Sequence, residues 1–210
     1  YRGLVAFDQV PQWRPESHLV WMGDGKHFMV FPVRSGTLLN YVGFVPTLTQ
    51  TAESWSAPGD REELLQSFAG WDPRITRLLE KVDTCYWWGL YDRAPLSRWT
   101  QGRLALLGDA AHPMLPHLGQ GANQGIEDGV ALAVLLQNRK PHDSVQDVLV
   151  RYEALRRPRT AMVQAEARKN GMRYDSKYTD LAQRDREIAN AAVLRRSFYD
   201  HDIEQEALQF

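Results

Sequence analysis

Residues 102–133 read GRLALLGDAAHPMLPHLGQGANQGIEDGVALA, and this stretch decides the fold. It begins with RLALL at 103–107, a short apolar run typical of a buried β-strand. Gly108 then lets the chain turn, and Asp109 places a carboxylate at the strand end. A helical pattern follows from Gly121. On this predicted helix, one face carries Ile126, Val130, Ala133 and Val134.

The loop between the predicted strand and helix has the chemistry of a ligand cradle. In α/β folds, ligands bind where strand ends lead into helices. Asp109 suits the hydroxyl groups of a sugar or polyol, and Gly119 and Gly121 allow close approach of the backbone. The N–H groups at a helix start favour an anion or a developing negative charge. The stretch therefore predicts a site for a polyhydroxylated, electron-accepting ligand, although the chain contains no GxGxxG fingerprint.

Composition indicates an ordinary globular protein with one large domain or two small ones. The chain has 210 residues, 43% of them hydrophobic, and a formal net charge of −1. It lacks the basic excess of a nucleic-acid-binding protein and any apolar run long enough to cross a bilayer. Cys85 is the only cysteine, which excludes a disulfide scaffold and fits a reducing compartment such as the cytoplasm. Because Tyr1 is not preceded by a methionine, we expect a piece of a longer protein.

The remaining patterns predict an antiparallel sheet with short helices, followed by a helical tail. Strands are predicted at 18–33, as a hairpin around Gly23-Asp24-Gly25, at 36–45 and at 84–93. Helices are predicted at 58–70, capped by Asp60 and ended by Gly70, at 72–82, and from about 143 to the end. Residues 151–169 carry six Lys or Arg against two Glu, which favours a solvated helical face.

The stretch 102–133 resembles the second flavin-binding motif of the class A FAD-dependent aromatic hydroxylases. The matching segments are Gly-Asp-Ala-Ala-His-Pro, Gly-Gln-Gly-Ala-Asn and Ile-Glu-Asp. The resemblance covers most of the chain and extends to YRGLV, HFMVFPVRSGTLLNYVGF, LYDRAPLSRW and RYEALRRPR. It is closest to the salicylate hydroxylase and 6-hydroxynicotinate 3-monooxygenase branch, which also holds 3-hydroxybenzoate 6-hydroxylase. Since the family's N-terminal GxGxxG and Asp-Gly motifs are missing here, the chain resembles the C-terminal portion and should bind FAD poorly alone.

The resemblance implies a mixed α/β fold, part of the p-hydroxybenzoate-hydroxylase-like FAD fold. An antiparallel substrate-domain sheet would be joined to the last strand and the helices of the FAD domain. Residues 1–100 would form the substrate-binding sheet with its helices, 101–140 the flavin loop with its strand and helix, and 141–210 the C-terminal helices. The implied partners are FAD, NADH or NADPH as co-substrate, a small aromatic substrate, the missing N-terminal half and a second copy in a homodimer.

The resemblance also assigns roles to single residues. The implied FAD contacts are Gly108, Asp109, Gly119, Gly121, Ala122 and Asn123, with Asp109 on the ribityl chain and the backbone of 121–123 at the pyrimidine end. Pro116 matches a proline beside the reacting position, and His117 and His27 match histidines near the substrate. By strand alternation His27, Met29 and Phe31 share one face, which we predict faces the ligand.

Either histidine suits a base that deprotonates a ring hydroxyl. His112 is expected to be structural, with its ring hydrogen-bonded to backbone. Glu127 and Asp128 are expected to stabilise the first turns of their helix electrostatically.

The implied function is hydroxylation of a small hydroxylated aromatic or N-heteroaromatic acid, using NAD(P)H and O2 through a flavin hydroperoxide. Two alternatives share the fold: another FAD oxidoreductase, or a non-catalytic module without the ADP-binding half. A third is a metal-dependent hydrolase with Asp109, His112 and His117 as ligands. Two prolines and the lack of a helical i,i+4 ligand pair weaken this third alternative, so no metal is expected.

Overall fold

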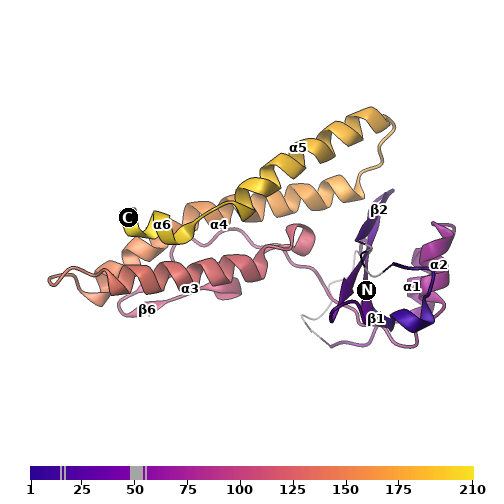
Figure 1. Cartoon of the computed structure of the whole chain (residues 1–210), viewed down its shortest axis with the longest axis horizontal. Coiled ribbons are helices and arrows are strands. Elements are labelled where there is room, and N and C mark those ends of the chain that lie inside the picture. The colour runs from indigo at the N-terminus through magenta and orange to yellow at the C-terminus, as the bar shows by residue number, and fades with distance from the viewer. Residues whose placement is uncertain (15, 17, 48–53, 55) are drawn as a thin grey trace. The chain divides into compact units, whose positions relative to one another are not determined.

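The computed structural model describes residues 1–14, 16, 18–47, 54 and 56–210 (Figure 1). They form two compact units. The sheet unit comprises Tyr1–Leu90 and Arg173–Lys177, and the helical unit comprises Tyr91–Met172 and Tyr178–Phe210. This mixture of an antiparallel sheet and helices confirms the predicted fold class. Among the described helices, none has the length and apolar character needed to span a membrane.

The sheet unit is built on a four-stranded antiparallel sheet in the order β1-β4-β3-β2. Its elements are β1 (Arg2–Ala6), the 3-10 turn η1 (Phe7–Gln9), β2 (Leu19–Gly23), β3 (Lys26–Val33), β4 (Leu38–Phe44), α1 (Arg61–Ser67) and α2 (Pro73–Leu79). The predicted hairpin is confirmed, with Gly25 at φ 75° in its turn, and β4 follows β3 as predicted. Edge strand β1 was not predicted.

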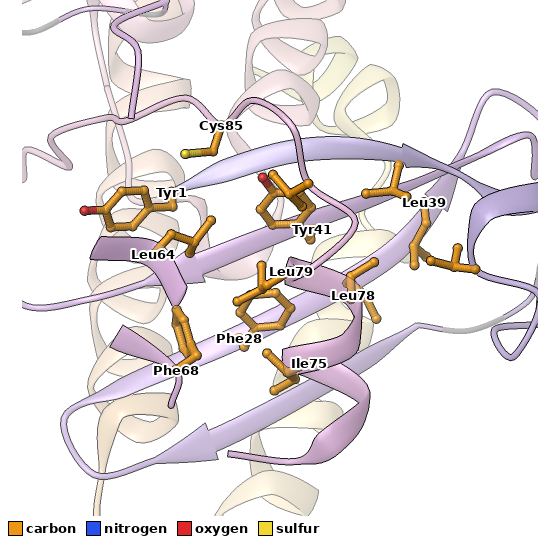
Figure 2. Packing of buried hydrophobic residues seen from close by; sticks show 14 of the residues in the cluster. Tyr1, Phe28, Leu39, Tyr41, Leu64, Phe68, Ile75, Leu78, Leu79 and Cys85 are labelled. Carbon is orange, nitrogen blue, oxygen red and sulfur yellow. The ribbon is translucent and has the colours of Figure 1, made fainter. Parts of the chain in front are cut away.

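Helices α1 and α2 cover one face of this sheet. Asp60 caps α1 as predicted, because its Oδ1 accepts hydrogen bonds from the N–H groups of Glu62 at 2.7 Å and Glu63 at 3.0 Å. Figure 2 shows the core that results, in which ring and aliphatic side chains of the sheet meet those of the helices. The labelled residues include Phe28, Leu39, Tyr41, Leu64, Phe68, Ile75, Leu78 and Leu79. Since Phe28 belongs to this core, His27, Met29 and Phe31 lie on the alternate side of β3.

The predicted strand at 84–93 is wrong. Within these residues only Tyr86 makes bridges, one to Arg2 and one to Pro58. The aromatic residues serve in side-chain stacking instead, since the ring of Trp87 packs edge-on against Tyr1 at 4.6 Å and the guanidinium of Arg2 lies 3.1 Å from the ring centroid of Trp88. The chain thus touches the sheet edge at one residue and then leaves it.

The helical unit holds the predicted succession of strand, loop and helix. Its elements are β5 (Thr100–Gln101), β6 (Leu104–Ala105), the 3-10 turns η2 (Gly108–Ala110) and η3 (Pro116–Leu118), α3 (Gly121–Gln137), α4 (Val145–Asp175), α5 (Leu181–Tyr199) and α6 (Ile203–Gln209). The last three residues of α4 belong to the sheet unit. Helix α6 packs on α3, and the end of α5 meets α4 through a hydrogen bond from Arg159 to the carbonyl oxygen of Phe198 (Figure 1).

The strand RLALL is shorter and more exposed than predicted. Only Leu104 and Ala105 form β6, which pairs antiparallel with β5 across a turn at Gly102. Leu104 is 61% exposed, and Leu107 is also exposed. The reason is that β6 has only one paired edge in the part of the chain that the structure describes.

The face predicted for α3 is buried only in part, since Val134 is buried and Val130 half-buried but Ala133 is exposed. Ile126 is 66% exposed, whereas the buried residues are Gln124, Asp128, Ala131, Val134 and Leu135. Two of these are polar, so the buried face is not the most apolar one. Likewise, the basic run 151–169 is not a purely solvated face, because Arg156 has no exposed surface. The buried polar residues of α3, Gln124 and Asp128, both accept hydrogen bonds from Arg156 of α4.

Candidate functional site

The carboxylate of Asp128 holds the loop between β6 and α3. Its Oδ2 accepts hydrogen bonds from the N–H of Gly108 at 2.8 Å and from His112 Nε2 at 2.6 Å, and its Oδ1 accepts one from Arg156 Nε at 2.8 Å. An ionised carboxylate can only accept, so His112 carries its proton on Nε2. The loop is therefore fixed at two residues, Gly108 and His112. Gly108 has a φ of 58°, which favours glycine.

The pKa of the Asp128 carboxyl lies below its usual value. Burial opposes ionisation most strongly, but the hydrogen bonds from His112, Gly108 and Arg156 together outweigh it. The group is therefore a carboxylate at neutral pH, paired with a buried guanidinium. A buried charge is tolerated only with such partners.

Arg156 ties helix α4 to the start of α3. Its Nη1 lies 2.6 Å from Glu127 Oε2, and its Nη2 donates to Gln124 Oε1 at 2.8 Å. Arg159 adds a second contact with Glu127 through Nε at 2.7 Å. Glu127 and Asp128 thus bind arginines of α4, rather than acting on their own helix start as predicted. His112 is structural as expected, but its partner is a side chain and not backbone.

Asp109 lies next to the first turn of α3. A Cβ placed on Gly121 would be 3.9 Å from Asp109 Oδ1, and both Asp109 and Ala122 are exposed. Among the described residues no side chain caps α3, so its first N–H groups point out of the helix without that partner. The loop thus brings Asp109 together with Gly121, Ala122 and Asn123, while open space lies beside Gly108 and Gly119.

This donor and acceptor set fits part of a flavin cofactor. The carboxylate can accept hydrogen bonds from the hydroxyls of a ribityl chain. The outward N–H groups can donate to a carbonyl or to developing negative charge at a helix start. The free space beside Gly108 and Gly119 allows a ligand to approach the backbone.

His117 lies in η3, where it is half-buried, and Pro116 beside it is exposed. The His117 carbonyl oxygen accepts a hydrogen bond from Asn170 Nδ2 at 2.7 Å. Its ring lies against the backbone of Gly171. Two residues of α4 therefore support His117, and neither was predicted.

His27 lies in the sheet unit and is fully buried. Its ring stacks on Phe44 with centroids 4.0 Å apart, and its Nδ1 lies 2.7 Å from Asp175 Oδ1. Met29 and Phe31, on the same side of β3, are half-buried. Asp175 was missed in the sequence, because 148 residues separate it from His27.

The described residues contain no cluster of metal ligands of the kind that the metal-hydrolase alternative requires. Across residues 1–14, 16, 18–47, 54 and 56–210, no three His, Cys, Asp or Glu side chains are grouped to hold a metal ion. His112, one of its three proposed ligands, is committed to Asp128.

The chain belongs to the FAD binding domain family, whose model matches residues 4–167. This agrees with the resemblance read from residues 102–133. The cofactor of the family is FAD.

Three relatives define the branch. The chain is 38% identical over 172 residues to a 3-amino-4-hydroxybenzoate 2-monooxygenase from Streptomyces platensis, covering 81% of the chain and 43% of that protein. It is 36% identical over 162 residues to a 6-hydroxynicotinate 3-monooxygenase from Pseudomonas fluorescens, covering 77% of the chain and 40% of that protein. A salicylate hydroxylase in a substrate complex superposes with a TM-score of 0.80 and 31% identity, over 99% of the chain and 55% of that structure. The chain thus spans about half the length of these relatives.

Proposed function

We propose that the chain is the C-terminal portion of an FAD-dependent monooxygenase that hydroxylates a small hydroxylated aromatic or N-heteroaromatic acid. The observation that carries the proposal is the placement of Asp109 beside the open start of α3, on a loop that Asp128 fixes. Membership of the FAD binding domain family supports the choice of cofactor.

Within this proposal the loop residues hold the flavin end of FAD. Asp109 binds the ribityl hydroxyls, and the N–H groups of Gly121, Ala122 and Asn123 face the pyrimidine end, with Gly108 and Gly119 leaving room for the ring. FAD, reduced by NADH or NADPH, supplies the activation of O2 for transfer of one oxygen atom to an aromatic ring. The chain's own residues orient the two reactants and handle the substrate proton.

His117 is proposed as the base that takes the proton of the substrate hydroxyl. It is half-buried, so a ligand can reach it, whereas His27 is fully buried beneath Phe44. Pro116, next to His117, is proposed to border the reacting position. His27, Met29 and Phe31 are proposed as the substrate side of the sheet, with Asp175 fixing the His27 ring.

The substrate class rests on the names of the relatives, which act on aminohydroxybenzoate and hydroxynicotinate. Both compounds are small ring acids with a hydroxyl group. A ring hydroxyl is a group from which the imidazole of His117 could take a proton.

An N-terminal half with the dinucleotide fingerprint is proposed to complete the protein. The chain spans only 43% of the aminohydroxybenzoate monooxygenase. Leu104, Leu107 and Ile126 expose apolar surface around the loop, which that half would cover. Residues 1–100, 101–140 and 141–210 are proposed as the substrate, flavin-loop and C-terminal helical parts. A cytoplasmic homodimer is the proposed form, to be tested by light scattering and cell fractionation.

The test uses the complemented protein, meaning this chain together with an N-terminal half that carries the GxGxxG fingerprint. Bound flavin would be measured by its visible absorption. NADH and NADPH oxidation would then be followed with salicylate, 3-amino-4-hydroxybenzoate and 6-hydroxynicotinate, and the products identified by mass. Stimulated oxidation with a product 16 mass units heavier, or with carboxylate replaced by hydroxyl, is expected.

Other outcomes would overturn the proposal. Flavin binding without hydroxylation of any ring acid would favour another FAD oxidoreductase. Failure to bind flavin would favour a non-catalytic module.

A further inference from the structure

We propose that Gly171 and Asn170 of α4 are positioning residues that set the place of the His117 ring. The proposal rests on the proposed function, in which His117 accepts the substrate proton. Nothing in the sequence motif around His117 points to these two residues, which lie more than fifty positions further along the chain.

The ring of His117 lies directly on the helix backbone at Gly171. A Cβ built on Gly171 would be 2.5 Å from His117 Cδ2, 2.7 Å from Nε2 and 3.1 Å from Cγ. The first two distances, to a carbon and to a nitrogen, are shorter than a Cβ atom tolerates, so one of the groups would have to move. Any side chain at position 171 therefore has to push the imidazole away.

Asn170, the residue before Gly171 on α4, holds the backbone of His117. Asn170 is 1% exposed, and its Nδ2 donates to the carbonyl oxygen of His117 at 2.7 Å. Six residues earlier on α4, Gln164 Nε2 donates to the carbonyl oxygen of Pro113, also at 2.7 Å. The buried side-chain amides of Gln164 and Asn170 thus hold the segment 113–117 against α4 by hydrogen bonds. Gly171 sets how closely the ring of His117 approaches the backbone of this helix.

The backbone of α4 does not itself require glycine at position 171. This residue lies inside the helix, and it is not among the glycines with positive φ. Glycine in a helix interior carries a free-energy cost relative to alanine. The structure offers one compensation for that cost, namely the close approach of the ring.

The experiment compares Gly171→Ala with Gly129→Ala. Gly129 is an exposed glycine inside α3 with open space where its Cβ would be, so it is a matched control for the same chemical change in a helix. In the complemented protein, Gly171→Ala should lower kcat for ring hydroxylation about tenfold or more and shift the acidic limb of its pH profile, because small displacements of a catalytic group are costly. Gly129→Ala should leave both unchanged.

A double-mutant comparison separates ring positioning from a general structural role. In the His117→Ala background the obstructing ring is gone, so adding Gly171→Ala should change kcat less than about twofold. If Gly171→Ala does not fold, the double variant should fold, since the ring alone is the obstacle. An equal loss in both backgrounds, or a double variant that also fails to fold, would overturn the proposal.

A second readout does not depend on activity. In the 210-residue chain, the imidazole NMR signals of His117 can be assigned by their loss in His117→Ala. They should move in Gly171→Ala and stay in place in Gly129→Ala, and unmoved signals in Gly171→Ala would overturn the proposal. If the signals move but the complemented protein hydroxylates no ring acid, the positioning role stands and the proposed function fails.

Discussion

His112 Nε2 lies 2.6 Å from Asp128 Oδ2, and the two side chains are 1% and 0% exposed. The same carboxylate accepts hydrogen bonds from Gly108 and Arg156. One buried charge therefore connects α3, α4 and the loop between β6 and α3. Removing a single partner from such a set leaves the others buried and unpaired, which is more costly than the loss of a surface ion pair.

Asp128→Asn should lower the free energy of unfolding by about 3 kcal/mol, because an amide cannot pair with both His112 and Arg156 as a carboxylate does. Urea unfolding at pH 7 followed by circular dichroism measures the change. Asp83→Asn, at an exposed position, is the control and should stay within about 0.5 kcal/mol of the parent. Similar midpoints for the two variants would contradict a central role for Asp128.

The stability of the chain should fall in acid partly through Asp128. Its pKa in the folded protein lies below that in the unfolded chain, because the hydrogen bonds from His112, Gly108 and Arg156 outweigh burial. The unfolded chain therefore takes up the proton first as the pH falls. The stabilisation is complete above the unfolded pKa of about 3.9 and is lost below it, as the pH falls through the folded pKa. Between pH 6 and pH 3 the urea midpoint of the parent should drop more steeply than that of Asp128→Asn, and parallel curves would refute this.

Asp109→Ala should weaken FAD binding to the complemented protein about tenfold or more, since a charge-assisted hydrogen bond to the ribityl chain is lost. Quenching of flavin fluorescence gives the dissociation constant. Because Asp109 is exposed, the urea midpoint should not change. Unaltered flavin affinity would remove Asp109 from the proposed site.

Leu104→Lys should reduce assembly with the N-terminal half, because a charge replaces an exposed apolar side chain on β6. Co-purification of a tagged N-terminal half measures assembly. Val193→Lys, on α5 and 75% exposed, provides the matched control. Equal yields with both variants would place the contact of the N-terminal half elsewhere.

His117→Ala should lower kcat of the complemented protein about 100-fold and remove the acidic limb of its pH profile, as expected for loss of a general base, which acts only when it is unprotonated. His27→Ala should act mainly on KM, because His27 is proposed as part of the substrate side of the sheet. The reverse pattern in steady-state kinetics would exchange the two roles.

The sequence predicted features that depend on neighbouring residues. The hairpin at Gly25, the cap at Asp60 and the loop at Gly108 follow from local turn and cap chemistry, and the structure has all three. The FAD family was likewise readable from the motif at 102–133, and the match to the family confirms it.

Interactions between distant residues were not predictable from periodicity. Arg156 is 28 residues away from Asp128, so the sequence of α3 alone did not show that its polar residues are buried and that Ile126 is exposed. The burial of β6 was overestimated because an apolar run does not show which neighbours cover it. Asn170, which holds His117, lies 53 residues away from it, and Asp175, which bonds His27, lies 148 residues away.

The hydrogen bonds to Asp128 also determine how the loop between β6 and α3 opens. The N–H of Gly108 donates to the Asp128 carboxylate, which also accepts a hydrogen bond from Arg156 of α4. Local opening of the loop would therefore leave this buried carboxylate without one of its hydrogen-bond donors. We therefore expect the Gly108 amide to exchange its hydrogen with deuterium only when α3 and α4 separate. The loop should behave as part of one cooperative unit with these helices, although by sequence it is rich in glycine and proline.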